Sequence, residues 1–248
     1  RKPLWGYRSM VYSLIFLGFM SFIVWAHHMF MTGMGTTMSN FFQTTTMIIS
    51  IPSIIILTAL LLSLWGGSIR FTVPMLFALA FLPMFGIGGL TGLPLGLSTP
   101  DIYLHDTYYV IGHFHYVVAP GTLFALFAGI YYWFPKVTGR LMHEGLGKLH
   151  FWLMFIGMNV TFGPMHWVGM DGMLRRNYTY QSGMGWDFWN MVSTIGSWCI
   201  ALAMLVFIWN FFKTMRKDPD DLTGDPWDGR TLEWSIPSPP PHYNFREI

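Results

Sequence analysis

The sequence predicts an all-α membrane protein with six transmembrane helices. Hydrophobic residues fill 53% of the 248 positions and charged residues only 10%, whereas a soluble domain carries about 25% charged residues. Mean hydropathy is +0.44. Six apolar runs each reach the roughly 20 residues that a helix needs to cross a bilayer. They are residues 9–32, 41–65, 73–96, 107–134, 148–169 and 187–212.

Basic residues predict the orientation of these helices, because short cytoplasmic loops are enriched in lysine and arginine. If the six helices alternate in direction, one side of the membrane carries Arg1, Lys2, Arg8, Arg70, Lys136, Arg140, Lys148, Lys213, Arg216 and Lys217. We therefore expect a multi-pass protein with both termini in the cytoplasm (or matrix). Arg175 and Arg176, in a loop on the opposite side, depart from this pattern.

The chain divides into a membrane domain, residues 1–217, and a polar, Pro-rich cytoplasmic tail, residues 218–248. Composition of this kind predicts polyproline character, so we expect the tail to lie along the protein or to be disordered.

The net charge of +2 is too small to indicate a nucleic-acid partner. The single cysteine, Cys199, excludes a disulfide framework within the chain. Because the first residue is Arg1, we interpret the chain as a processed product or part of a larger polypeptide.

Two histidines in the fourth run, His113 and His115, are candidate haem ligands. Each residue turns a helix by about 100°, so these two side chains point about 200° apart. One helix can therefore offer one imidazole to each of two prosthetic groups on either side of it. Ionisable residues inside a membrane span are costly and often functional, and imidazole is the commonest proximal haem ligand. The alternative is two buried imidazoles bonded to carbonyls.

A second pair, His27 and His28, lies near the outer end of the first run. Adjacent positions are about 100° apart on a helix, so both rings can reach one metal only where the helix bends or loosens. Gly33 and Gly35, just beyond, allow that. Neutral imidazoles suit copper, zinc or iron. Both pairs lie at a similar depth, which favours a metal site over two interfacial histidines.

Charged residues gather at the outer end of the fourth run. Asp106 suits a helix N-terminus as a cap; alternatively, His105 and Asp106 form a hard-cation site or bind a haem propionate. Arg175 and Arg176 need a negative partner, which haem propionates would supply through charge-assisted bonds, unless the pair is solvated. Asp101 is expected to form a turn or to pair with these arginines.

Other aromatic and histidine residues have less specific roles in this interpretation. Trp25 and Tyr116 lie beside the histidine pairs and either line a cofactor or pack as ordinary aromatics. His150 and His166 lie near the two ends of the fifth run, where we expect interfacial positions.

Three stretches together resemble subunit I, the catalytic subunit, of the haem–copper oxygen reductases: Val24 to Phe30, His105 to Tyr116, and Arg175-Arg176. The mitochondrial-like cytochrome c oxidases are the closest fit, and the resemblance runs from residue 2 to about residue 245. It implies four-electron reduction of dioxygen to water with coupled proton translocation.

The resemblance also implies ligand roles. His27 and His28 resemble two of the three ligands of the active-site copper. His113 resembles the proximal ligand of a high-spin, a3-like haem, and His115 resembles one of the two axial ligands of a low-spin, a-like haem.

At the outer end, His105 and Asp106 resemble ligands of a magnesium or manganese site. Arg175 and Arg176 resemble the arginines that hold haem propionates.

The family's subunit I has about twelve helices, and this chain resembles only the second half of that bundle. The resemblance therefore implies a partner polypeptide that carries the N-terminal half, with the third copper histidine and the second histidine of the low-spin haem. It also implies subunit II, with its dinuclear copper and cytochrome c docking surface, subunit III and membrane lipid.

The second run departs from the family pattern Ile-Pro-Thr-Gly-x-Lys, whose lysine belongs to a proton channel. Here the sequence is Ile51-Pro52-Ser53-Ile54-Ile55-Ile56. Ile56 cannot relay a proton, although Ser53 could still bind water.

Alternatives remain at the level of reaction and location. Residues 224–245 resemble bacterial members of the family more than animal mitochondrial ones. The predicted location is therefore the bacterial plasma (inner) membrane, with the mitochondrial inner membrane as the alternative. The electron donor is cytochrome c or quinol. A related nitric oxide reductase is the rival enzyme, but the block His105-Asp106-Thr107-Tyr108 argues against it. A non-enzymatic membrane scaffold is the rival of another class.

Overall fold

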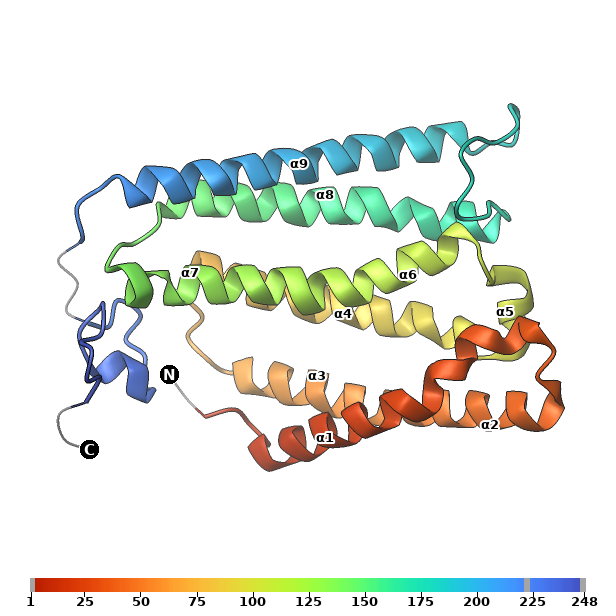
Figure 1. Cartoon of the computed structure of the whole chain (residues 1–248), viewed down its shortest axis with the longest axis horizontal. Coiled ribbons are helices and arrows are strands. Elements are labelled where there is room, and N and C mark those ends of the chain that lie inside the picture. Colours follow the sequence, from red (N-terminus) through yellow and green to blue (C-terminus); the bar gives the residue numbers. More distant parts are fainter. Residues whose placement is uncertain (1–2, 221–223, 246–248) are drawn as a thin grey trace.

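The computed structural model describes residues 3–220 and 224–245, which form an all-helical protein (Figure 1). Arg1 and Lys2, used above for orientation, lie outside the described residues. The helices are α1 Tyr7–Val24, η1 Trp25–Thr32, α2 Gly35–Ile48, α3 Ser50–Leu64, α4 Val73–Leu95, α5 Ser98–Leu104, α6 Tyr108–Val118, η2 Ala119–Phe124, α7 Ala125–Thr138, α8 Glu144–Met170, α9 Asp187–Met215 and η3 Leu232–Ser235.

Figure 1 shows the helices in three layers. One layer holds α8 and α9 side by side, the middle layer holds α4 with α6 and α7, and the third holds α1 with α2 and α3. The main apolar core lies between α4, α6–α7, α8 and α9, and contains fully buried aromatic side chains such as Phe77 and Phe124. The middle layer is therefore the packed centre of the protein, and α6 lies within it.

Five helical stretches are long and apolar enough to cross a membrane: Tyr7–Thr32, Gly35–Leu64, Val73–Leu95, Tyr108–Thr138 and Asp187–Met215. The sixth predicted span, 148–169, does form a helix, the 27-residue α8, but it is not among these five. Its charged start at Glu144 and Lys148 and its interior histidines, asparagine and glycines lower its hydropathy. Composition alone thus supports five spans rather than six.

Proline and glycine explain where the long helices change geometry. The first span loosens into the 3₁₀ helix η1, followed by Gly33 at φ 80° and Gly35 at φ 77°. This confirms the predicted loosening next to His27 and His28. The fourth span contains one π-helical stretch, Ala119–Phe124, where Pro120 removes a backbone donor and forces the helix to widen.

Small residues let the helices approach closely, as is common between membrane helices. A Cβ added at Gly196 of α9 would lie 2.6 Å from the backbone nitrogen of Thr161 on α8. A Cβ at Gly88 of α4 would lie 2.7 Å from the carbonyl oxygen of Tyr116 on α6. At both interfaces, the glycine therefore leaves space for a backbone atom of the neighbouring helix.

The described part of the tail, residues 224–245, lies against the end of α7. The Lys136 ammonium donates to the carbonyl oxygens of Ile236 (2.8 Å) and Pro237 (3.2 Å) and lies over the Trp234 ring. The Trp227 indole donates to the Tyr132 carbonyl at 2.8 Å. Of the two expectations for the tail, the structure thus supports the one in which it lies along the protein.

The start of α6 and the end of α8 are joined through the segment that follows α8. The Tyr108 amide donates to the Met173 carbonyl at 2.9 Å, and the Arg175 amide donates to the Asp106 carbonyl at 2.8 Å. A Cβ at Gly169 would lie only 1.9 Å from the Tyr109 nitrogen. At this point α6 and α8 are so close that a residue with a Cβ would not fit at position 169.

We predict that Gly169→Ala destabilises the protein, because the added methyl would push α8 away from Tyr109. Overpacking of this kind costs about 1–3 kcal/mol or more. The measurement is the thermal unfolding midpoint of the protein purified in detergent. Gly163→Ala is the matched control on α8, since its Cβ would meet only the Tyr116 hydroxyl at an ordinary 3.5 Å. Equal midpoints for both variants would contradict the close approach.

Candidate functional site

His113 points from α6 toward α4. Its Nδ1 donates to the Gly88 carbonyl at 2.9 Å and lies 3.3 Å from the Thr91 hydroxyl. Because a carbonyl can only accept, the neutral ring carries its proton on Nδ1 and keeps the Nε2 lone pair for a ligand bond. Metal-binding histidines are usually oriented in this way. Gly92 leaves room for the ring, since a Cβ there would lie 2.7 Å from Cε1.

His115 points from α6 toward α8. Its Nδ1 donates to the Ile111 carbonyl at 2.8 Å, so this ring also keeps Nε2 as an acceptor. The ring stacks on Phe162 with centroids 3.9 Å apart and planes 9° apart. The two imidazoles therefore leave α6 toward different neighbours, as the helical spacing predicts. Their role as haem ligands stays a prediction.

His27 and His28 converge within η1. Their Nε2 atoms are 3.2 Å apart. Two imidazole nitrogens that bind one ion at about 2.0 Å each are roughly 3 Å apart, so this spacing fits one shared metal. The His27 Nδ1 lies 3.1 Å from the buried Thr46 hydroxyl of α2, which can hold the ring in place.

A network of four charged or titratable side chains, called the outer network after its predicted side of the membrane, lies at the N-terminal end of α6. The Arg175 Nε donates to Asp106 Oδ1 at 2.6 Å, and its Nη2 contacts the same oxygen. The His105 Nδ1 lies 3.5 Å from Asp101 Oδ2, and its Nε2 lies 3.7 Å from Asp106 Oδ2. Burial alone would raise the pKa of Asp106, but the hydrogen bond and charge of Arg175 hold that pKa below its ordinary value.

Three expectations for this region were wrong. Thr107, not Asp106, caps α6, since its hydroxyl accepts from the Tyr109 amide at 3.3 Å. Asp106 instead adopts a left-handed backbone, φ 56°, and pairs with Arg175. Asp101 is neither a loop residue nor a partner of the arginines: it lies buried in α5 beside His105, and burial raises its pKa.

Two further candidates differ in exposure. Trp25 is 65% exposed, whereas Tyr116 is 5% exposed and donates from its hydroxyl to Asn159 Oδ1 at 2.9 Å. Tyr116 therefore lies in the interface between α6 and α8, and its position favours aromatic packing. Arg176 follows Arg175 in a left-handed conformation, φ 67°.

His150 and His166 are both buried at their ring nitrogens. His150 is 0% exposed and lies among aromatic rings, with its Nδ1 3.2 Å from the Tyr131 hydroxyl. The Nε2 of His166 is also buried. Their expected positions at the membrane interface stay a prediction.

Within the described ranges, no three His, Cys, Asp or Glu side chains gather closely enough to hold a metal ion. The histidine pair in η1 thus offers two nitrogen donors and the outer network offers His105 and Asp106. Further ligands for either ion would come from outside these residues.

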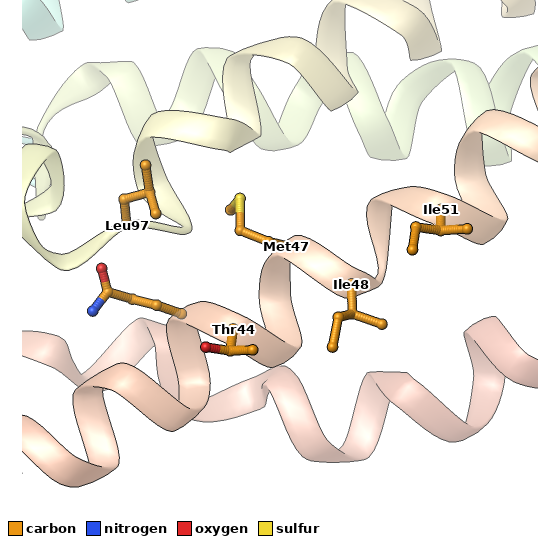
Figure 2. Close-up of a pocket in the computed structure, with 6 residues that line it drawn as sticks. Thr44, Met47, Ile48, Ile51 and Leu97 are labelled. Atoms are coloured by element: carbon orange, nitrogen blue, oxygen red, sulfur yellow. The ribbon is translucent and has the colours of Figure 1, made fainter.

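An apolar groove of about 470 Å³ lies along α2 and the start of α3. Figure 2 shows its labelled side chains on α2 and α3 and, across the groove, Leu97. Its lining residues are Gln43, Thr44, Met47, Ile48, Ile51 and Leu97. None of the candidate ligands lines it, so the groove does not enter the ligand assignments.

The fold and its apolar spans define an integral membrane protein with imidazoles held inside a helical bundle. Residues 1–199 match the family described as "Cytochrome C and Quinol oxidase polypeptide I". The chain belongs to this family.

Named relatives include both kinds of oxidase subunit. The chain is 48% identical over 248 residues to cytochrome c oxidase subunit 1 of Bacillus sp. (strain PS3), and the alignment covers 100% of this chain and 40% of that relative. It is 44% identical over 247 residues to quinol oxidase subunit 1 of Bacillus subtilis (strain 168), covering 99% of this chain and 38% of that relative. The chain therefore spans about 40% of the length of these curated relatives.

A solved structure supports the fold. A heme-copper terminal oxidase dimer determined by cryo-EM superposes with a TM-score of 0.72 at 22% identity, over 88% of this chain and 43% of that chain. The resemblance to one half of subunit I is thus confirmed at the level of family and fold.

We predict that Asp106→Asn loosens the segment that follows α8, because it removes the charge that Arg175 binds. A partly exposed ion pair contributes about 1 kcal/mol, which corresponds to roughly fivefold faster hydrogen exchange at the Tyr108 and Arg175 amides. Exchange measured by mass spectrometry checks this. Asp171→Asn, an exposed acid in the same segment, is the control, and equal protection in both variants would be the contrary result.

Proposed function

We propose that this chain is part of the catalytic subunit of a terminal oxidase that reduces dioxygen to water with coupled proton pumping. The observation that carries the proposal is the arrangement on α6, where two imidazoles with bonded Nδ1 atoms leave one helix toward different neighbours. The chain would act within a complex, because residues 3–220 and 224–245 offer too few ligands to complete a copper site by themselves.

The residues present fit the implied groups. His113 would hold a high-spin, a3-like haem, His115 would be one ligand of a low-spin, a-like haem, and His27 with His28 would hold the active-site copper. When bound, these groups would supply the electron transfer and dioxygen binding that protein side chains lack.

The chain's own contribution is orientation. The Gly88 carbonyl holds the His113 ring, the stack on Phe162 holds the His115 ring, and the Thr46 hydroxyl holds the His27 ring. Outer-shell contacts of this kind tune ligand basicity and affinity.

The outer network fits a magnesium or manganese site. Arg175 binds Asp106 Oδ1, whereas Asp106 Oδ2 lies 3.7 Å from the Nε2 of His105. A carboxylate oxygen suits either cation. Since Arg175 already binds Asp106, Arg176 is the arginine we propose for a haem propionate.

The proposed electron donor and partner subunits follow from the same assignment of the chain to a terminal oxidase. Relatives named cytochrome c oxidase and quinol oxidase match the chain about equally well, and we propose cytochrome c as the donor, through a subunit II. The N-terminal half of subunit I would supply the remaining ligands, and a subunit III would complete the complex. Proton uptake would use that other half, because Ile56 cannot carry protons and the Ser53 hydroxyl donates to the Ile49 carbonyl of its own helix.

We further propose that α8 is a sixth span in a bacterial plasma membrane, with both termini cytoplasmic. Its 27 residues give about 40 Å of helix, enough to cross a bilayer of about 30 Å. It packs along α9, itself an apolar span, so the two helices would cross together.

Replacing each α6 histidine should remove a different haem. In the assembled complex, we expect His115→Ala to abolish the low-spin haem signal and to keep much of the high-spin signal, and His113→Ala to do the reverse. Optical and EPR spectra with haem quantification measure both. Equal loss of both haems in each variant, with assembly intact, would contradict ligation on two faces of α6.

The six-span topology predicts opposite labelling of two single-cysteine variants in a Cys199→Ser background. Tyr178→Cys, at a fully exposed position between α8 and α9, should react with an impermeant maleimide on intact cells. Leu232→Cys, in the tail, should react only after permeabilisation. Labelling of Leu232→Cys from outside would contradict six spans with both termini in the cytoplasm.

A further inference from the structure

We propose that His166 of α8 is a positioning residue that fixes the rotation of α6 about its own axis, and thereby the directions of His113 and His115. The inference rests on the proposed haem ligation by those two histidines. His166 itself has no assigned role in that function, and its ring lies inside the interface between α6 and α8.

One face of α6 forms a socket for the His166 ring. A Cβ at Gly112 would lie 2.8 Å from both Cε1 and Nδ1 of His166, so only a glycine leaves space for the imidazole. The Tyr109 ring meets it edge to face, with centroids 5.1 Å apart and planes at 90°. The Tyr116 ring lies 5.6 Å away on the other side. Residues spaced by three and four along a helix share a face, so all three belong to one surface.

The imidazole is itself held by α8. Its Nδ1 donates to the Gly163 carbonyl at 3.2 Å. Its Nε2 is buried and, among the described residues, has no hydrogen-bond partner. A buried nitrogen left without a partner disfavours folding, so an apolar ring could fill the same socket without that cost.

Rotation of α6 is a sensitive variable because both ligands lie on this helix. The Cα atoms lie about 2.3 Å from a helix axis, and an imidazole Nε2 lies several ångströms further out. A rotation of about 10° therefore moves each Nε2 by roughly 1 Å. His113 and His115 point in different directions, so one rotation misaligns both. His166 blocks this rotation from α8, and the contact of Gly88 with Tyr116 blocks it from α4.

The test uses His166→Ala in the complete complex, with His150→Ala as the control. Both variants remove a buried imidazole from α8, but His150 packs on Phe77, Phe127 and Phe207, away from the α6 ligands. The readouts are the g values of the low-spin haem and the iron–histidine stretching frequency of the reduced high-spin haem, at normal haem content.

For His166→Ala we expect both signals to shift or broaden, while His150→Ala lowers thermal stability and leaves both unchanged. His166→Phe, which refills the socket, should return both signals most of the way to wild type. Wild-type signals in His166→Ala, or the same shift in His150→Ala, would overturn the proposal. If the alanine variant fails to assemble, His166→Leu should show a smaller shift of both signals, and unchanged signals there would likewise overturn it. A wild-type complex without haem would instead defeat the proposed function.

Discussion

The candidate site depends on one constraint, the close packing of α6 between α4 and α8. Glycines make it possible: Gly88 admits the Tyr116 backbone, Gly112 admits the His166 ring, and Gly169 admits the Tyr109 backbone. With no methyl group in these three places, α6 has little freedom to turn or slide. Imidazoles on such a helix are already oriented before any metal or haem binds, which is the kind of preorganisation that metal sites need.

Much of this arrangement was predictable from local sequence. Helical periodicity alone separated His113 from His115, because their angular difference depends only on residues per turn. Likewise Gly33 and Gly35 predicted the loosened helix end that brings His27 and His28 together. Apolar run lengths located the helices to within a few residues, apart from the earlier start of the second span at Gly35.

What the sequence could not provide was the partner of each polar group. The Thr46 hydroxyl near His27, the Gly88 carbonyl bonded to His113 and the Phe162 ring on His115 come from helices distant in sequence. The capping alternative for Asp106 failed for the same reason. A local rule made it a helix cap, but its pairing with Arg175, 69 residues away, places it elsewhere and leaves the cap to Thr107.

We propose that α6 carries one ligand for each of two different haems. The most direct measurement is a carbon monoxide titration of the reduced, purified complex, with haem and this chain quantified together. We expect two haems per copy of the chain, of which one binds carbon monoxide. One haem per copy, or carbon monoxide binding to both, would contradict it.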